Sequence, residues 1–388
     1  MAPAEGKPRG LALSALAVAL VLSWQWATVH ANYGGNWTAL FCTGALRGVP
    51  ASLASEHIWR FPASNGFDGQ LYHYIAHDPL MRNLSLKASV DDPRLRYRRI
   101  LIPGLAYLMA AGRPDRVDRA YYALILVFIG AGVYWTAACC RSLSHSPAWG
   151  LLFIILPATI VSADRMVVDV ALAALAAGFA YHVRAPSWRL FLILSAAALT
   201  RETGFLLLAG YCGYLLLERR WTRMAAFSLA ALPAFAWYAY VHAHTSSDHY
   251  RMSFVPLSAI LTDLLHPLVY PPGVRLVWLA KIGDYMALGG ILAAFALALR
   301  WSIRRKLDPV ALSLLCFVAM GLILQNTDHW LQVYDYGRVY SPALLFLGLE
   351  GLKRRSWAPL VPLSLMLPRI GMQLGGQILG VFTTVKLV

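Results

Sequence analysis

Residues 120–140 read AYYALILVFIGAGVYWTAACC and contain no charged side chain. Because a helix that crosses a bilayer needs about 20 apolar residues, this run indicates a membrane-spanning helix. Ten further apolar runs lie near residues 11–30, 149–163, 167–183, 188–200, 203–217, 223–243, 276–299, 309–325, 339–352 and 357–380. The sequence therefore predicts an all-α fold, a polytopic transmembrane helix bundle of about eleven spans in one domain, residues 1–388. Several runs within 149–217 are short for a span, which favours broken helices beside a cavity.

The composition supports a bilayer as the solvent for most of the chain. Hydrophobic residues make up 59% and charged residues 14% of the 388 positions, and the mean hydropathy is +0.55. A soluble protein of this size would expose too much apolar surface. The formal charge of +15 suggests a nucleic-acid partner, but the basic residues lie in short clusters between apolar runs, as membrane topology requires. We therefore expect membrane lipid, and no nucleic acid, as a partner.

The cysteines and histidines predict no cofactor and no metal. The five cysteines show no disulfide framework or metal-ligand spacing, since four lie in apolar runs and only Cys42 lies in a loop. Residues 242–249 contain three histidines and one aspartate, but their spacing matches no standard zinc motif.

The N-terminus predicts a signal anchor. Lys7 and Arg9 precede the first apolar run, and residues 29–31 (VHA) resemble a signal-peptidase site, so a cleaved signal peptide is the alternative. We favour an uncleaved anchor, because Trp24 and Trp26 extend the run and suit an interfacial position.

The basic residues assign an orientation to the spans. With a cytoplasmic N-terminus, every inside loop carries Lys or Arg, which is the positive-inside pattern. The loops 31–119 and 244–275 then lie outside and are long enough to cover the outer face. If the run 100–111 spanned the membrane, the later basic loops would lie on the outer side, against the positive-inside pattern. We therefore expect an interfacial or re-entrant helix there. Most acidic residues and histidines fall on the outer side, which favours a site facing the periplasm or exterior of a bacterial inner membrane.

The first outer loop contains the segment GFDGQLYHYIAHDP, residues 66–79. It predicts a short amphipathic helix that starts at Asp68, lies on the membrane surface and ends near Asp78. A carboxylate at a helix N-terminus is stabilised in its ionised form, and the flanking glycines let a ligand approach closely. Asp68 is therefore a candidate general base, and a helix cap without a further role is the alternative.

Arginines precede the run 100–111. Guanidinium groups at headgroup depth suit phosphate contacts, whether the phosphate belongs to bulk lipid or to a substrate. For Arg94 and Arg96 we favour general anchoring to anionic lipid. Arg99 lies nearest the membrane and is the candidate for a substrate phosphate.

Two charged pairs lie between apolar runs, where ionisable residues are costly and tend to be paired or functional. Arg201 and Glu202 are neighbours that would point about 100° apart on a helix, so we expect them to have different partners. Arg165 and Asp169 have helical i,i+4 spacing, which predicts a structural ion pair.

The late segment 325–340 mixes aromatic and hydrogen-bonding side chains. Aromatic faces beside polar groups suit a sugar, and Arg338 at a helix start suits a phosphate. The aromatic residues would serve equally well in an interfacial belt.

Three segments in order resemble the GT-C superfamily of integral-membrane glycosyltransferases, and within it the PIG-V-like mannosyltransferase group and its bacterial relatives. They are residues 67–79 (FDGQLYHYIAHDP), 200–204 (TRETG) and 338–342 (RVYSP). Phe-Asp-Gly stands where the eukaryotic members have Trp-Asp, and Arg-Glu-Thr stands where they have Arg-Ser-Asn. Mannose is therefore not assigned as the sugar. The chain has no Asp-X-Asp or His-Glu-Asp, so a metal is not expected.

The resemblance implies inverting transfer of a monosaccharide from a polyprenyl-phosphate-linked donor to a hydroxyl of a glycan, lipid or protein acceptor outside the cytoplasm. Asp68 would deprotonate the acceptor, and Arg99, Arg201 and Arg338 would bind the donor phosphate. We expect the substrate-binding residues to be Gln70, His73, Glu202, Asp328 and Tyr336.

Two other classes of function remain open. A lipid-linked-sugar flippase or small-molecule transporter would show internal repeats and ionisable residues at the midplane, and neither pattern is evident. A structural scaffold for cell-envelope assembly would have no requirement for Asp68.

Overall fold

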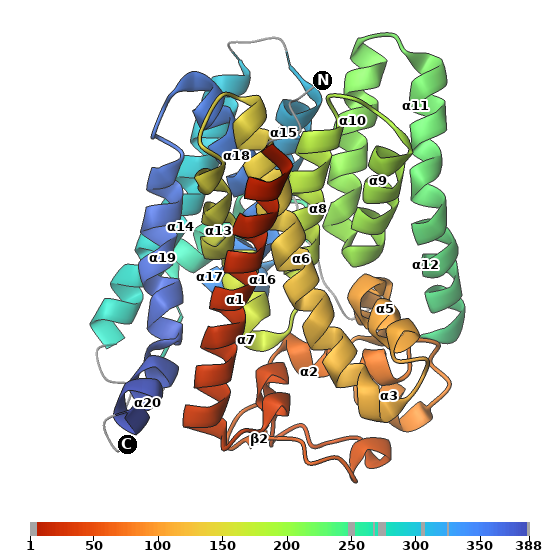
Figure 1. Cartoon of the computed structure of the whole chain (residues 1–388), viewed down its shortest axis with the longest axis vertical. Coiled ribbons are helices and arrows are strands. Elements are labelled where there is room, and N and C mark those ends of the chain that lie inside the picture. The colour runs from red at the N-terminus through yellow and green to blue at the C-terminus, as the bar shows by residue number, and fades with distance from the viewer. Residues whose placement is uncertain are drawn as a thin grey trace.

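A computed structural model describes residues 6–246, 253–266, 268–270, 277–303, 307–323 and 326–385. Within these residues the fold is all-α, as predicted, apart from two short parallel strands, β1 (Thr43–Gly44) and β2 (Arg60–Phe61). The helices form an elongated bundle. Its N-terminal helix starts at one end, and α2, α3 and β2 gather at the other end (Figure 1).

Among the residues that the structure describes, four helical segments are long and apolar enough to cross a membrane. They are α1 (Gly6–Tyr33), α6 (Pro114–Ser142), α14 (Val277–Ser302) and the continuous stretch of α11 (Trp221–Ser228), η5 (Leu229–Ala231) and α12 (Leu232–His244). A fifth span is formed if the bent pair η3 (Pro147–Ile155) and α7 (Pro157–Arg165) counts as one. This pair is bent by 56°, and Pro157, which lacks a backbone N–H, follows the break. The prediction of a broken helix is thus confirmed for the run 149–163.

The other apolar helices are shorter than the roughly 20 residues of a perpendicular span. This set comprises α8 (Asp169–His182), α9 (Trp188–Thr200), η4 (Glu202–Gly204) with α10 (Phe205–Leu217), and α15 (Pro309–Ile323). The chain ends with α16 (Thr327–Trp330), α17 (Val333–Val339), α18 (Ser341–Arg354), α19 (Leu360–Gln373) and α20 (Gly375–Val385). The run 357–380 is therefore two helices. The four long apolar helices α1, α6, α11–α12 and α14 fit a multi-pass membrane protein. The count of eleven spans stays a prediction.

The two predicted outer loops contain several short helices. The first has η1 (Trp37–Phe41), η2 (Ala51–Leu53), α2 (Asp68–His77), α3 (Leu84–Ala88), α4 (Pro93–Arg98) and α5 (Leu101–Met109). Helix α5 has nine residues, too few to span a bilayer, in agreement with the expected interfacial or re-entrant helix. The second loop contains one helix in its described part, α13 (Ser258–Leu265). Residues 247–252, 267 and 271–276 of that loop lie outside the described part of the chain.

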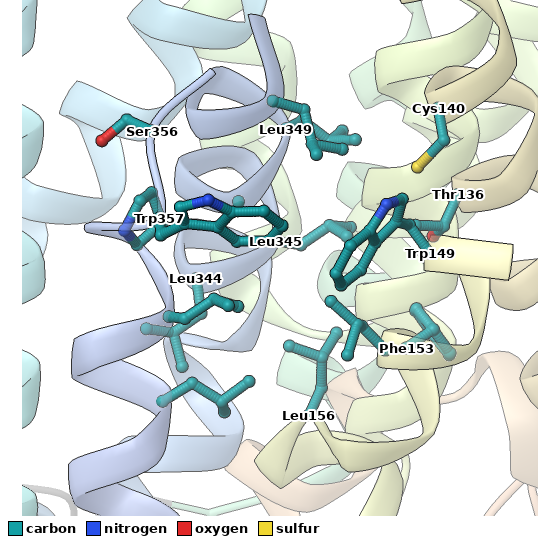
Figure 2. Close-up of a pocket in the computed structure, with 16 residues that line it drawn as sticks. Thr136, Cys140, Trp149, Phe153, Leu156, Leu344, Leu345, Leu349, Ser356 and Trp357 are labelled. Carbon is teal, nitrogen blue, oxygen red and sulfur yellow. The ribbon is translucent and has the colours of Figure 1, made fainter. Parts of the chain in front are cut away.

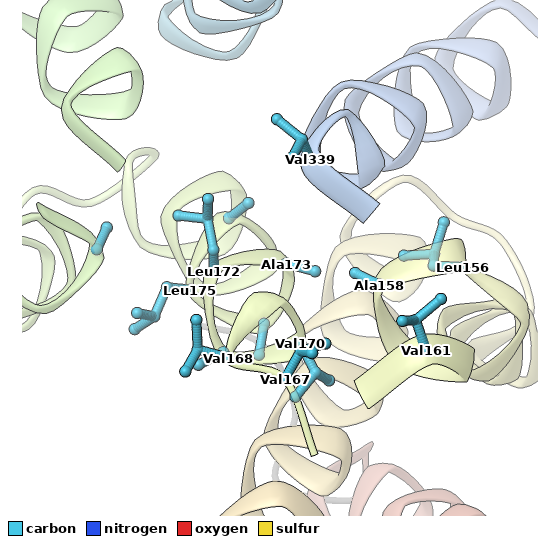
Figure 3. Close-up of a cluster of buried hydrophobic side chains, with 14 of the residues drawn as sticks. Leu156, Ala158, Val161, Val167, Val168, Val170, Leu172, Ala173, Leu175 and Val339 are labelled. Atoms are coloured by element: carbon cyan, nitrogen blue, oxygen red, sulfur yellow. The ribbon is translucent and has the colours of Figure 1, made fainter. Parts of the chain in front are cut away.

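Helix α8 lies at the centre of the hydrophobic core. Its residues 169–180 are all buried, and a helix that is apolar on every side belongs in a core. Figure 3 shows side chains at its start, such as Val168 and Val170, together with Val161 of α7 and Val339 of α17. Because α7 and α17 pack on each other and on α8, the N-terminus of α8 is held between them. Asp169 occupies that terminus.

Candidate functional site

Helix α2 carries Asp68 into the bundle. The eight residues after Asp68 are all buried. A Cβ added at Gly69 would lie 2.0 Å from Arg165 O and 2.9 Å from Phe41 O, so only glycine allows α2 to pack this closely on the end of α7. The prediction that α2 lies on the membrane surface is wrong, because protein covers even its apolar side.

The predicted ends of α2 are confirmed. The helix starts at Asp68, with Phe67 as the capping residue, so the carboxylate lies in the first helical turn. At the other end Asp78 is the C-terminal capping residue, and its Oδ2 accepts a hydrogen bond from the backbone N–H of Asn83 at 2.6 Å. Asp78 therefore ends the helix and starts the next turn, as expected.

Asp68 lies between two guanidinium groups. Its Oδ2 accepts a hydrogen bond from Arg338 Nη2 at 2.5 Å, and its Oδ1 lies 3.0 Å from Arg96 Nη1. Burial would raise the pKa of Asp68, but the charges of Arg338, Arg96 and Arg99 outweigh it and lower the pKa well below its usual range. Asp68 is therefore ionised in the unliganded protein.

Arg96 belongs to this site. Besides its contact with Asp68, it forms a two-pronged ion pair with Asp91 through Nε and Nη2, each at 3.0 Å. The prediction that Arg96 anchors general lipid is wrong, since these protein carboxylates use its guanidinium. Arg94 is also bound within the protein, where its Nη2 donates to the backbone oxygen of Thr245 at 2.8 Å.

Arg338 joins one carboxylate of its own helix to two from distant parts of the chain. It contacts Asp68, Asp335 Oδ1 at 2.7 Å and Asp169 Oδ2 at 3.6 Å. Its own side chain is only 5% exposed, and its Nε makes no hydrogen bond with a described residue. A buried guanidinium with remaining N–H capacity suits a further oxygen ligand.

The predicted pair of Arg165 with Asp169 is wrong. Asp169 pairs with Arg201 Nη1 and with Arg338, whereas Arg165 Nε lies 3.3 Å from Asp164 Oδ2. Met166 has a left-handed backbone with φ of 47° and ends α7. The four-residue spacing therefore crosses a helix break and no longer places the two side chains on one face.

Arg201 and Glu202 have different partners, as predicted. Arg201 binds Asp169, while Glu202 Oε2 accepts a hydrogen bond from Arg99 Nε at 3.1 Å. Arg99 also donates from Nη1 to the hydroxyl oxygen of Tyr72 at 3.0 Å. The charged turn between α9 and α10 is thereby tied both to the start of α8 and to the first loop.

These groups line one cleft. A space of about 360 Å³ is bounded by all four residues that were predicted to do chemistry or bind phosphate, namely Asp68, Arg99, Arg201 and Arg338. Arg96, Asp335 and His329 also line it. An adjoining space of about 310 Å³ shares Arg99, Arg201 and His329 and continues between apolar side chains, Leu206, Met320 and Val339. The site thus combines a charged chamber with an apolar arm.

Burial and neighbouring charges shift the pKa values of the cleft residues in different directions. Burial raises the pKa of Asp335; Arg338 opposes this and the charge of Asp68 adds to it, so the net shift is opposite to that of Asp68. Burial and the nearby charges of Arg201, Arg338 and Arg99 lower the pKa of His329 to about 3, so its imidazole is neutral near pH 7. The chamber therefore offers an ionised carboxylate, guanidinium groups and a neutral imidazole.

Three predicted substrate-binding residues lie away from the cleft lining. Gln70 is 2% exposed; its Oε1 accepts from Gly44 N at 3.1 Å and its Nε2 donates to Asn65 O at 2.8 Å. His73 is fully buried and stacks on Phe41. Tyr336 is buried with its ring stacked on Trp330. The fourth, Glu202, lines the apolar arm.

The fifth predicted substrate-binding residue, Asp328, lies in α16, but its side chain is outside the described part of the structure. The same holds for Asp248 and His249 of the histidine-rich segment.

Sequence reasoning did not assign Arg96, Asp169, Asp335 and His329 to the site. For two of these a local signal existed. Arg96 is three residues before Arg99, and Asp335 is three residues before Arg338, so each pair is spaced to share a helix face. For Asp169 no local signal pointed away from Arg165.

A separate apolar pocket lies between α6, η3, α18 and α19. Figure 2 shows Trp149 and Trp357 on facing sides of it, with their ring centroids 5.3 Å apart. The space is about 80 Å³, and Cys140 is its one titratable lining group. Thr136 and Ser356 add two hydroxyl groups, but the lining has no Asp, Glu, His, Lys or Arg and does not resemble the charged cleft.

Among the described side chains, one group has the spacing of metal ligands: Glu56, His73 and His77. It does not include a residue that lines the Asp68 cleft.

Comparison of the chain with protein-family models, curated proteins and solved structures gives no significant match.

Proposed function

We propose that the chain is an integral-membrane glycosyltransferase of GT-C type. It would transfer a monosaccharide from a polyprenyl-phosphate-linked donor to an acceptor hydroxyl, with inversion at the anomeric carbon. The observation that carries this proposal is the position of Asp68 in one cleft with the guanidinium groups of Arg96, Arg99, Arg201 and Arg338. An anionic leaving group requires such cations, and a hydroxyl nucleophile requires a base.

In the proposed step, the acceptor oxygen attacks the anomeric carbon and forms the new glycosidic bond. The bond between that carbon and the donor phosphate oxygen breaks, and the acceptor proton moves to Asp68. The leaving polyprenyl phosphate keeps the electron pair of the broken bond, and the arginines stabilise its charge.

The ion pairs of Asp68 give donor binding a role in activating the base. In the unliganded cleft Arg338 and Arg96 hold the carboxylate ionised with a low pKa, which makes it a weak base. A phosphate that takes over contacts with Arg338 would remove part of this stabilisation. The pKa of Asp68 would then rise as the donor binds, so that the base becomes stronger when its substrate is present.

The apolar arm supports a lipid-linked donor. It leaves the charged chamber beside Arg99 and Arg201 and runs between α10 and α15, where Leu206 and Met320 line it. An isoprenoid chain placed there would keep its phosphate at the arginines. The donor therefore needs no nucleotide-binding fold.

The proposed topology has eleven spans and an active site on the outer side of a bacterial inner membrane. Asp68 lies at the end of the bundle that contains α2 and α3, whereas the turn between α10 and α11 lies at the opposite end (Figure 1). That turn carries Arg219 and Arg220, and basic loops favour the cytoplasmic side.

The test is a transfer assay with the purified full chain in detergent. Labelled polyprenyl-phosphate hexoses serve as donors, and a membrane extract supplies acceptors. We expect transfer by the wild type and a loss of about 10²- to 10⁴-fold in Asp68→Asn, the range for removal of a general base. Asp115→Asn is the matched control, because this carboxylate is exposed and outside the cleft.

No transfer by the wild type, or equal transfer by Asp68→Asn, would contradict the proposal. Movement of labelled donor across proteoliposomes without sugar transfer would instead support a flippase.

A further inference from the structure

A second cluster of chemical groups lies on α2, away from the proposed active site. Glu56, His73 and His77 each offer one ligand atom, and these atoms all lie within 4.8 Å of one another. His73 Nε2 is 4.0 Å from Glu56 Oε2, and His77 Nδ1 is 3.7 Å from Glu56 Oε1. Asp118, from the first turns of α6, places Oδ1 2.9 Å from His73 Nε2 and 3.4 Å from His77 Nε2.

Helix geometry separates this cluster from Asp68. At about 100° per residue, His73 and His77 lie about 140° and 180° around the α2 axis from Asp68. The two histidines are spaced i,i+4 and therefore share a face. One face of α2 thus presents the carboxylate to the cleft, and the other presents two imidazoles to Glu56 and Asp118.

His73 is fixed within this cluster. Its side chain is 0% exposed, its Nε2 pairs with Asp118 Oδ1 at 2.9 Å, and its Nδ1 makes no hydrogen bond with a described residue. The ring is fixed by stacking on Phe41, with centroids 4.2 Å apart and planes at 10°. The buried carboxylates and imidazoles of the cluster are costly to desolvate unless they are paired with one another or bound to an ion.

His77 has the arrangement of a metal-binding histidine held by a carboxylate. Its Nε2 contacts Asp118 Oδ1 at hydrogen-bond distance, while its Nδ1 faces Glu56. A hydrogen bond from Nε2–H to Asp118 leaves the lone pair of Nδ1 available, and it orients the ring for a metal. Asp118 thus acts through His77.

We propose that Glu56, His73 and His77 bind one divalent transition-metal ion, of which Zn²⁺ is the reference case. Two imidazoles and one carboxylate form a donor set that zinc accepts, with a further position for water. Ligand atoms around tetrahedral zinc lie about 3.3 Å apart, so the separations of 3.7 Å and 4.0 Å, and of at most 4.8 Å within the group, would shorten by up to about 1.5 Å when the ion binds. The ion would also offset the negative charges of Glu56 and Asp118.

The surrounding charge supports a cation at this position. The carboxylates of Glu56 and Asp118 both face the two imidazoles. The cluster therefore attracts positive charge, and a metal ion would compete with a proton for it.

The metal would hold three parts of the chain together. Glu56 comes from the loop after η2, the histidines come from α2, and Asp118 comes from α6, so a bound ion would fix the first loop against the bundle. Because the two histidines lie on the side of α2 opposite Asp68, we assign the metal a structural role. The inference is independent of the proposed glycosyl transfer, because it concerns the stability of the chain.

The experiment uses the full chain, purified in detergent without a histidine tag. Metal content is measured by mass spectrometry, and thermal unfolding is followed after chelation with EDTA and after addition of Zn²⁺. We expect about one equivalent of metal per chain, a lower melting temperature after chelation and recovery with Zn²⁺. Glu56→Gln and His77→Gln should retain less than about a tenth of that metal.

His57→Gln is the matched control, since this exposed histidine lies in the same loop, next to Glu56, and should leave metal content unchanged. Asp118→Asn should still bind metal, with about 10- to 100-fold weaker affinity in competition with a chelator, because it acts through His77. A wild type without metal whose melting temperature responds to neither EDTA nor Zn²⁺ would overturn the inference, even if the variants fail to fold.

Discussion

Arg338 and Asp68 lie 270 residues apart in the chain, and Arg338 Nη2 donates a hydrogen bond to Asp68 Oδ2 at 2.5 Å. This contact joins the start of α2 in the first loop to α17 near the C-terminal end of the bundle. Each partner has a further charged neighbour, Asp335 for Arg338 and Arg96 for Asp68. The pair therefore couples the fold of the outer segments to the charge of the proposed base.

Replacement of Arg338 tests how much the fold depends on this network. Arg338→Ala leaves three mostly buried carboxylates without a shared counter-ion, so we expect a stability loss of about 3 kcal/mol or more. Thermal or denaturant unfolding in detergent measures it. Arg113→Ala removes an exposed ion pair and should leave the unfolding transition in place. Equal transitions for both variants would show that the network contributes little.

Acid should selectively remove the stabilisation from Asp68. Its folded-state pKa is lowered, so its ion pairs stabilise the fold above the unfolded value of about 3.9 and lose this contribution as the pH falls toward the folded-state pKa. The melting temperature of the wild type should therefore exceed that of Asp68→Asn at pH 7, and the difference should shrink below about pH 4. A difference that stays constant between pH 7 and pH 3 would contradict this assignment.

Gly69→Ala should destabilise the protein. Its Cβ would meet two backbone oxygens, which cannot move aside as a side chain can, so we expect a loss of about 1–3 kcal/mol. Gly289→Ala is the control, for which we expect a gain in stability instead of a loss. No atom lies within 4 Å of a Cβ there, and alanine in mid-helix should stabilise by about 0.5–1 kcal/mol. Thermal unfolding of both variants decides whether α2 is packed this tightly.

If the proposed function holds, filling the apolar arm should discriminate between donors by chain length. Met320→Trp should raise the KM for a long polyprenyl donor by about ten-fold, equivalent to about 1.4 kcal/mol, with little effect on a short-chain analogue. Leu216→Trp, at an exposed position of α10, should alter neither. An equal rise in KM for both donors would place the lipid chain elsewhere.

The local features of the site could be read from the sequence with fair accuracy. The glycine-flanked Asp68 and the proline after Asp78 marked both ends of α2, because caps and breakers act within a few residues. The separate partners of Arg201 and Glu202 followed from the turn per residue of a helix. Arg99, Arg201 and Arg338 were expected to share a side of the membrane, and they share a cleft with Asp68.

The burial of α2 could not be predicted from its sequence. Its sequence has a moderate apolar side that would equally suit a membrane surface, and nothing local distinguishes lipid from neighbouring protein. Gln70 and His73 were polar residues in a loop next to a candidate base, which made them candidates for substrate contacts. Their actual positions depend on the segments 43–66 and 114–142 that fold around α2.

The sequence by itself determined the all-α class, the presence of several long apolar helices and the start of α2 at Asp68, because hydropathy and capping are properties of contiguous residues. Only the tertiary structure decided that Asp169 pairs with Arg201 and Arg338 instead of Arg165. A left-handed residue, Met166, interrupts the helix that the spacing assumed. Contacts between residues on different helices depend on which helices pack together, and no local pattern encodes that choice.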